Sequence, residues 1–366
     1  MKTFVIPVLA VFTALVLGAL LILATGGDPL LAYRGLWEGS FGRPSSISET
    51  LVWATPYIFA GLAVALAFKA GLFNIGAEGQ LSVGALASAW VGFAVTGVPW
   101  PLHLLLALGA GMLAGALWAG IAGLLKARTG AHEVITTIML NYIALLGSGY
   151  LLSGLLKDPN PLVALAQTPK ILESARLPPI LSDLRLHWGF VLALVLALGV
   201  WWLLYKCTLG FEIRTVGLNL SAARYAGIGV GRTIIVAMAL SGALAGLAGT
   251  VEVVGLNYYH TPGFSVGYGF DSIAVALLGR NHPLGVVPSA ILFGALRAGA
   301  SRMQFVSQIP IDVISIIQAL VLIFVAADEI VRWIYRLPHP RTQSGPDAPE
   351  ATAPELAVAR GWGRGE

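Results

Sequence analysis

Ten apolar runs recur along the chain between short polar segments, and most are long enough to cross about 30 Å of hydrocarbon as a helix. Lipid leaves the backbone only α-helices or a closed barrel, because its polar groups must be satisfied internally. The runs lack the period-2 alternation of barrel strands. The pattern therefore predicts an all-α integral membrane protein, a polytopic bundle of about ten spans with short or broken helices. The expected spans are residues 4–24, 51–69, 73–95, 101–125, 133–155, 188–206, 233–254, 268–279, 284–302 and 311–331.

Three segments are too polar or too rich in proline to be spans. Residues 156–187 are proline-rich and mixed in charge, which predicts an ordered outer loop. Residues 207–232 form the longest expected inner loop. Residues 337–366 are rich in Pro, Ala and Gly and cannot bury a core, so we expect a disordered cytoplasmic tail behind a membrane domain at 1–336.

Glycine interrupts the apolar pattern at related places in the two halves. "GLFNIGAEGQLSVG" (71–84) and "GYGFDSIAVALLGRNHPLG" (267–285) each combine short apolar stretches, glycines and one acid. Such interrupted segments in corresponding positions are typical of broken helices beside a transport path. Two further stretches, "GMLAG" (111–115) and "GALAG" (242–246), have the small-xxx-small spacing that favours close helix packing.

The composition supports a membrane protein, and the charges indicate its orientation. Hydrophobic residues make up 57% and charged residues 11% of the chain, with a mean hydropathy of +0.81, whereas soluble domains carry about 25% charged residues. With both termini cytoplasmic, fourteen Lys and Arg lie on the inner side and seven on the outer side, as the positive-inside rule requires. We therefore expect both termini in the cytoplasm. Lys and Arg are scattered singly, so no basic patch predicts nucleic-acid binding.

The sequence has no motif for nucleotide, metal or cofactor binding. It lacks a G-x-x-x-x-G-K-[ST] loop, and its one cysteine, Cys207, excludes an internal disulfide and a thiolate metal cage. The stretch 263–267 matches the G-x-S-x-G motif of serine hydrolases and lies close to His260. Because that motif needs a strand-to-helix turn in an α/β sheet, we interpret it as a flexible outer loop and keep an intramembrane hydrolase as a distant alternative. We expect no enzymatic activity.

Four stretches in sequence order carry a resemblance to a known family. They are "FNIGAEGQLSVGA" (73–85), "HEVITTIMLNYIA" (132–144), "IRTVGLNLSAARYAGIGV" (213–230) and "GFDSIAVALLGRNHPLGVVPSAILFGAL" (269–296). Together they resemble the permease subunit of bacterial ATP-binding cassette (ABC) importers for nucleosides and simple sugars, within the branched-chain amino acid and ribose permease family. The resemblance covers residues 50–330. One departure is visible: where the family usually has Glu-Asn-Pro, this chain has Leu218-Asn219-Leu220.

The resemblance implies a plasma-membrane permease that imports a nucleoside or, as a second choice, a simple sugar. It implies three protein partners: a second homologous permease, cytoplasmic ABC ATPase subunits and an extracytoplasmic substrate-binding protein. Because the chain has no nucleotide site of its own, the work must come from such a partner. An ion-coupled secondary transporter is the alternative, and it would need an acid at the middle of the membrane.

Within the inner loop, the residues suit a docking element. Ser221 is expected to cap a short helix from Ala222 onward, Gly227 and Gly229 are expected to end it, and Arg224 offers a fixed charge to a partner. An ordinary basic loop is the simpler interpretation of the residues alone. The resemblance favours coupling to the ATPase through Asn219, Ser221, Ala222, Ala223, Arg224 and Tyr225.

Ionisable and polar residues inside the expected spans are the remaining signal. Glu252, Asp271 and Arg297 are expected in the outer part of the membrane, where they either pair to hold helices together or line a polar substrate path. Asn141 either binds a ligand hydroxyl or bridges helices, and bridging is the more favoured interpretation.

Glu78 follows Asn74 and Gly76 and is expected in the first turns of a helix that starts near the inner surface. The positive end of the helix dipole favours a carboxylate there, so we expect Asn74, Gly76 and Glu78 to stabilise the start of a broken helix. At that depth a direct contact with substrate is not expected. None of the acids Glu78, Glu252 and Asp271 is expected at the midplane of the membrane, which argues against the secondary transporter.

Overall fold

A computed structural model describes residues 2–160, 162–181, 183–265, 267–310, 312–326, 330–331 and 334–336, so the predicted tail at 337–366 lies outside the described residues. The described chain is helical, and its one β-bridge is isolated, between Pro179 and His187. Its elements are α1 (Lys2–Ala24), α2 (Pro29–Phe41), α3 (Pro44–Lys69), α4 (Ala77–Ala94), α5 (Trp100–Thr129), α6 (Glu133–Ser153), the 3-10 helix η1 (Glu173–Ala175), α7 (Gly189–Lys206), α8 (Thr208–Leu218), α9 (Leu220–Tyr225), α10 (Val230–Glu252), the π-helix η2 (Val253–Asn257), α11 (Tyr268–Leu278), α12 (Pro283–Ser307) and α13 (Asp312–Ala326).

Seven of the described helices are long and apolar enough to cross a membrane. They are α1, α3, α5, α6, α7, α10 with its continuation η2, and α12. The helices α11 and α13 are apolar but shorter, and α4 is not among the seven. The chain is therefore a multi-pass membrane protein, and the predicted count of about ten spans is not confirmed.

Two helical regions were hidden by their polar sequence. Helix α2 was not predicted; it begins where the Asp28 carboxylate accepts hydrogen bonds from the backbone N–H groups of Leu30 (2.8 Å) and Leu31 (3.3 Å). Helix α3 begins at Pro44, seven residues before the predicted span. The prediction missed these residues because they are rich in Ser and Thr rather than apolar. The expected inner loop is also largely helical, since α8 and α9 occupy most of it.

Glycines bring α4, α5 and α10 into close contact. A Cβ atom at Gly242 would lie 2.2 Å from the Gly115 carbonyl oxygen, and one at Gly246 would lie 2.3 Å from that of Gly111. A Cβ at Gly84 in α4 would lie 2.5 Å from the Gly246 Cα. The two small-xxx-small stretches of the sequence therefore face each other, which confirms their predicted role in packing.

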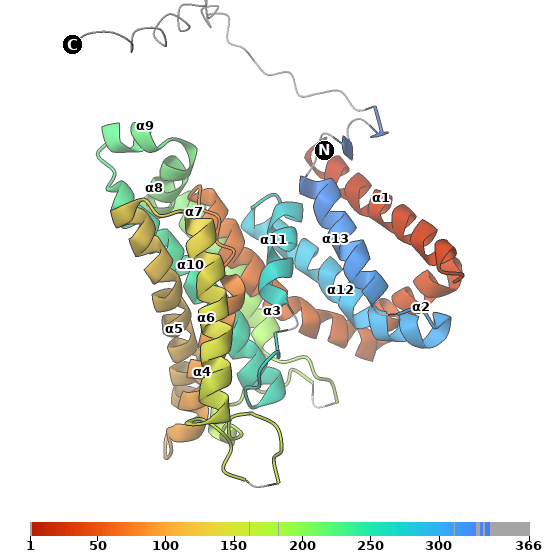
Figure 1. Cartoon of the computed structure of the whole chain (residues 1–366), viewed down its shortest axis with the longest axis horizontal. Coiled ribbons are helices and arrows are strands. Elements are labelled where there is room, and N and C mark those ends of the chain that lie inside the picture. The colour runs from red at the N-terminus through yellow and green to blue at the C-terminus, as the bar shows by residue number, and fades with distance from the viewer. Residues whose placement is uncertain are drawn as a thin grey trace, which may run out of the picture.

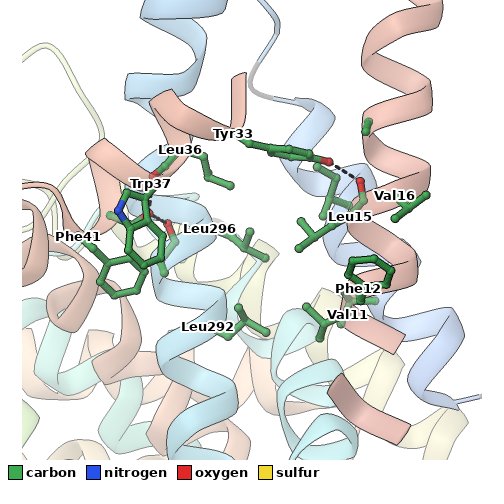
Figure 2. A pocket seen from close by; sticks show the side chains of 15 residues that line it. Val11, Phe12, Leu15, Val16, Tyr33, Leu36, Trp37, Phe41, Leu292 and Leu296 are labelled. Carbon is green, nitrogen blue, oxygen red and sulfur yellow. Dashed lines mark hydrogen bonds between the residues drawn. The ribbon is translucent and has the colours of Figure 1, made fainter. Parts of the chain in front are cut away.

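The helices form two neighbouring groups (Figure 1). One group holds α4, α5, α6 and α10, and the other holds α1, α2, α12 and α13, with α3 and α11 between them. Helices α8 and α9 project beyond the first group at one end of the molecule, which we call the α9 end. Between α1 and the pair formed by α2 and α12 lies an apolar groove (Figure 2).

Candidate functional site

Helices α4 and α11 meet with their first turns in the interior of the molecule. The Glu78 carboxylate, in the first turn of α4, accepts hydrogen bonds from the Ser265 hydroxyl and from the Gly269 N–H (2.7 Å) of α11. The two backbones are so close that a Cβ at Gly269 would lie 2.2 Å from the Glu78 nitrogen. The positive ends of two helix dipoles therefore converge on one buried carboxylate, which favours its negative charge.

The depth predicted for this start of α4 is wrong. The Asn74 side chain donates to the Ser241 hydroxyl (2.8 Å), and Ser241 lies midway along the 23-residue helix α10. After α3 ends at Lys69 near α8, the chain turns back into the interior before α4 begins, so Glu78 lies near mid-depth rather than near a surface. At this position Glu78 does not count against an ion-coupled transporter, whereas Glu252 lies in the last turn of α10 as expected of an acid near a helix end.

Asn74 fixes the start of α4. Its side-chain oxygen accepts from the Gly76 N–H (3.0 Å) and from the Gln80 amide (2.9 Å), and its amide donates back to Gln80 (2.9 Å). Ser241 in turn donates to the Ala63 carbonyl of α3 (2.7 Å). These buried bonds join α3, α4 and α10 at one point, and they give Asn74 and Gly76 the structural place that the sequence indicated.

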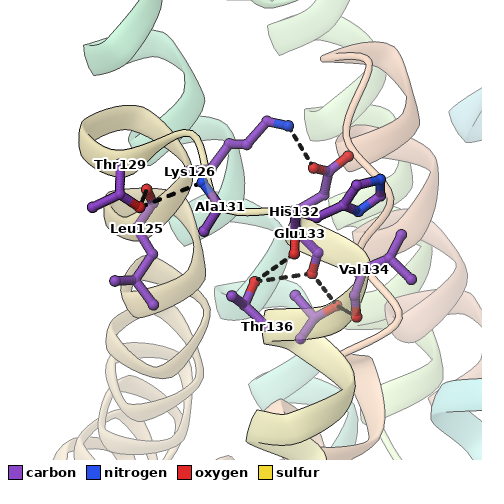
Figure 3. Close-up of polar contacts among 9 residues, drawn as sticks. Leu125, Lys126, Thr129, Ala131, His132, Glu133, Val134 and Thr136 are labelled. Carbon is purple, nitrogen blue, oxygen red and sulfur yellow. Dashed lines mark hydrogen bonds and ion pairs between the residues drawn. The ribbon is translucent and has the colours of Figure 1, made fainter.

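Asn141 of α6 bridges the same region. Its amide donates to the Ile75 carbonyl and its oxygen accepts from the Gly79 N–H, both at 2.8 Å, so the structure shows the bridging alternative. The turn before α6 is held by an ion pair between α5 and α6. There Lys126 of α5 forms an ion pair with Glu133 (2.7 Å), at the first residue of α6 (Figure 3).

Asp271 borders an aromatic cluster that sequence reasoning missed. We use "aromatic cluster" for Trp53, Tyr57, Tyr268 and Phe293, which come from α3, α11 and α12. The Tyr57 hydroxyl donates to the Asp271 carboxylate (2.7 Å), and the Tyr57 ring lies edge-on to Tyr268, with ring centroids 5.0 Å apart. The apolar context of Tyr57 gave no signal of this role, because its partner is 214 residues away in the sequence.

Of the other two predicted membrane charges, Arg297 lies beside this cluster. The Arg297 guanidinium carbon lies 5.9 Å from the centre of the Trp53 ring, and Trp53, Asp271 and Arg297 are all half-buried. Glu252 is buried in the last turn of α10. The pairing of Arg297 with Glu252 or Asp271 stays a prediction.

The serine of the 263–267 motif contacts the interior of the molecule. Ser265 is buried and donates its hydroxyl to Glu78. Both ring nitrogens of His260 lack a hydrogen-bond partner among the described residues, and burial lowers the pKa of His260 to about 4. Ser265 is therefore hydrogen-bonded to a carboxylate rather than to a histidine base, unlike the nucleophile of a serine hydrolase. Among the described residues no group of three or more side chains could hold a metal ion.

Helix α9 has a different cap from the one predicted. Asn219, not Ser221, accepts hydrogen bonds from the backbone N–H groups of Ser221 (2.9 Å) and Ala222 (3.0 Å). Asparagine is as good an N-cap as serine, so the helix forms without the proline of the family pattern. At the other end Gly227 has a φ of +78° and its N–H reaches the Arg224 carbonyl (3.0 Å). Gly229 does not end α9; it is the N-cap residue of α10.

The exposed part of α9 is narrower than the predicted docking element. Ala223 is fully buried within the chain, whereas Tyr225 is 98% exposed. Ser221, Ala222 and Arg224 are exposed beside it. We call Ser221, Ala222, Arg224 and Tyr225 the α9 surface. Ala223 packs beneath it, and Asn219 holds its first turn.

Comparison with known proteins places this arrangement in a family. The family model described as "Branched-chain amino acid transport system / permease component" matches residues 46–326. The guanosine ABC transporter permease protein NupP of Bacillus subtilis is 46% identical over 90% of this chain and 94% of its own length. The nucleoside permease NupB of Lactococcus lactis is 36% identical over 89% of this chain and 91% of its own length. The glucose permease TsgB13 of Haloferax volcanii is also 36% identical, over 94% of this chain and 92% of its own length.

All three of these organisms also hold a second, more distant relative. The guanosine ABC transporter permease NupQ of B. subtilis is 29% identical over 68% of this chain, and the nucleoside permease NupC of L. lactis is 26% identical over 72%. No solved structure gives a significant match.

Proposed function

Because the chain belongs to the branched-chain amino acid transport system permease family, we propose that it is the membrane subunit of an ABC importer that carries a nucleoside across the plasma membrane. The observation that carries the substrate class is the 46% identity, over 90% of the chain, to a permease named for guanosine. A simple sugar is the second candidate, because a relative of 36% identity is named for glucose. A self-sufficient ion-coupled carrier is not favoured by this family.

The half-buried Trp53 ring of the aromatic cluster, with Asp271 and Arg297 beside it, is the proposed wall of the substrate path, and the buried rings of Tyr57, Tyr268 and Phe293 support it from behind. Aromatic rings provide stacking surfaces that every nucleobase can use. The Asp271 carboxylate can accept hydrogen bonds from ribose hydroxyls, and charge-assisted bonds of this kind are the stronger ones. We keep Arg297 and Glu252 as proposed residues of this path, whereas Asn141 and Glu78 hold the surrounding helices.

Other subunits complete the proposed importer. The paired relatives in B. subtilis and L. lactis support a second permease, which would form the path together with this chain. The sequence has no P-loop, so we propose that separate ATPase subunits hydrolyse ATP and dock at the α9 surface. An extracytoplasmic binding protein would deliver the substrate from the opposite side.

Replacing Asp271 by asparagine tests the proposed path. Asparagine can still accept the Tyr57 hydrogen bond, so the packing should hold, but the lost charge should weaken uptake of radiolabelled guanosine about tenfold, or about 1.4 kcal/mol. Glu49→Gln is the matched control, because Glu49 forms only an exposed ion pair with Arg185 (3.1 Å). Unchanged uptake of guanosine, adenosine, uridine and glucose by Asp271→Asn, at equal folded yield, would remove Asp271 from the path.

The single cysteine tests the proposed orientation. Cys207 is partly exposed at the start of α8, so its labelling reports the side of the membrane on which the α9 end lies. With that end in the cytoplasm, a membrane-impermeant maleimide should leave Cys207 unmodified in intact cells and modify it after permeabilisation. Single cysteines placed in residues 157–160 of the predicted outer loop, in a chain lacking Cys207, should give the opposite pattern. Labelling of Cys207 from outside would reverse the orientation.

A further inference from the structure

Two neighbouring cavities, which we together call the groove, lie along α1. Its first part is a cavity of about 490 Å³ between α1, α2, α12 and α13 (Figure 2). Its second part is a cavity of about 800 Å³ at the start of α12. Val11 of α1 and Leu292 of α12 line both cavities, so the two parts adjoin at these side chains.

The first part of the groove is lined almost entirely by apolar atoms, and the Trp37 indole N–H is its one polar side-chain group without a hydrogen bond among the described residues. Among its fifteen lining residues only Tyr33 and Ser40 carry hydroxyl groups, and both hydroxyls are already used. Tyr33 donates to the Leu15 carbonyl (2.5 Å), and Ser40 donates to the Ala295 carbonyl (2.5 Å). A nucleoside or sugar would leave most of its hydroxyls unpaired here, which costs free energy, so hydrocarbon suits this part.

The second part ends in positive charge. Lys69, the last residue of α3, lines it together with Arg280 and His282, and none of the described residues that line it is acidic. Burial, and after it the charge of Lys69, lower the pKa of His282, which favours the neutral form of its ring, so the Lys69 ammonium is the main positive charge assigned to this part. Helix α12 begins beside them at Pro283, which adds the positive end of its dipole.

The charged end lies at the surface, and the apolar part reaches into the membrane. A Cβ at Gly217 of α8 would lie 2.2 Å from the Lys69 carbonyl oxygen, which places Lys69 at the α9 end. Leu292 follows Pro283 by nine residues, so the second part extends about 14 Å along α12 to where it adjoins the first part. A cationic end at the membrane surface and an apolar channel leading inward match the two parts of a phospholipid.

We propose that this groove binds an anionic phospholipid, with its phosphate at Lys69 and Arg280 and one acyl chain between α1 and α12. Basic pockets between membrane helices on the cytoplasmic side bind anionic head groups, and the cytoplasmic leaflet supplies such lipids. The acyl chain fills a groove whose walls would otherwise lose their packing contacts. The bound lipid thereby connects α1 to α3 and α12.

Photo-crosslinking with two lipids that differ only in their head group tests this site. The full chain is reconstituted in nanodiscs of phosphatidylcholine with a minor share of phosphatidylglycerol. Either lipid carries a diazirine on one acyl chain. The phosphatidylglycerol probe should label the α1 segment 7–11 and the α12 segment 284–292. Lys69→Ala with Arg280→Ala should reduce this labelling about tenfold. Lys206→Ala with Arg232→Ala, which removes two exposed basic residues of the same end that do not line the groove, should leave it unchanged.

Three results would overturn the site. The first is equal labelling by the phosphatidylcholine probe, and the second is unchanged labelling in the Lys69 and Arg280 double variant. The third is loss of labelling when a second permease is co-purified, which would assign the groove to a protein interface.

Excess inorganic phosphate should not displace the probe, and displacement would mean that the site binds the anion alone. Leu292→Trp, which fills the junction of the two cavities, should block labelling even with both cations present.

Discussion

Replacing Gly246 by leucine is expected to eliminate most of the folded protein. Even a Cβ at this position would lie 2.3 Å from the Gly111 carbonyl oxygen and 3.1 Å from the Gly115 Cα, and both neighbours are backbone atoms that cannot rotate away. Overpacking costs about 1–3 kcal/mol when side chains can adjust, and more when they cannot. We therefore expect the folded yield to fall about tenfold or more, as measured by size-exclusion chromatography of fluorescently tagged protein in detergent.

Gly120→Leu is the matched control for this change. Gly120 lies on α5, one of the two helices that meet at this contact, but no heavy atom would lie within 4 Å of its added Cβ. Its folded yield should equal that of the unchanged chain. A normal yield of Gly246→Leu, or an equal loss in both variants, would contradict the close contact between α5 and α10.

The glycine contacts show what a sequence pattern can predict. The small-xxx-small spacing of "GMLAG" and "GALAG" indicates that each helix packs closely against something. It does not indicate that the two stretches face each other, or that Gly84 of α4 joins them. The partner depends on how the chain folds back between the helices, and no local pattern encodes that path.

The depth of Glu78 was mispredicted for the same reason. Apolar run lengths placed the start of its helix at a surface, because hydropathy does not register a chain that turns back inside the bundle. The bond that reveals the depth joins Asn74 to Ser241, which are 167 residues apart. Ser265, which sequence reasoning assigned to a loop, likewise gains its role only from a contact with Glu78, 187 residues away.

The capping of α9 was mispredicted by two residues. Asn219 and Ser221 are both good N-cap residues, and the sequence alone does not choose between them. The choice matters, because a helix that starts at Leu220 turns Ala223 inward and leaves Ala222, Arg224 and Tyr225 exposed. An enlarged residue at Ala223 would therefore disturb the chain itself, and Ala222 is the better position for testing docking.

Replacing Ala222 by tryptophan is expected to abolish substrate uptake. Ala222 is exposed on the α9 surface, so the large side chain should not affect the helices but should prevent the surface from fitting a groove of the ATPase. Arg224→Glu should weaken the same contact through like-charge repulsion, which can cost several kcal/mol at an interface and grows at low salt. Arg128→Glu is the charge-matched control, because Arg128 is exposed in the last turn of α5, outside the α9 surface.

Retention of the ATPase by the Ala222→Trp chain is the most direct test of the proposal that an external ATPase drives this permease. The chain, the second permease and the ATPase subunits are co-expressed, and the ATPase that co-purifies with the tagged chain is measured together with guanosine uptake, at matched expression. We predict a folded Ala222→Trp chain that keeps the second permease, loses the ATPase and transports no guanosine. The Arg128→Glu chain should retain the second permease and the ATPase and should transport guanosine normally. Normal ATPase retention and normal uptake in Ala222→Trp would contradict docking at the α9 surface.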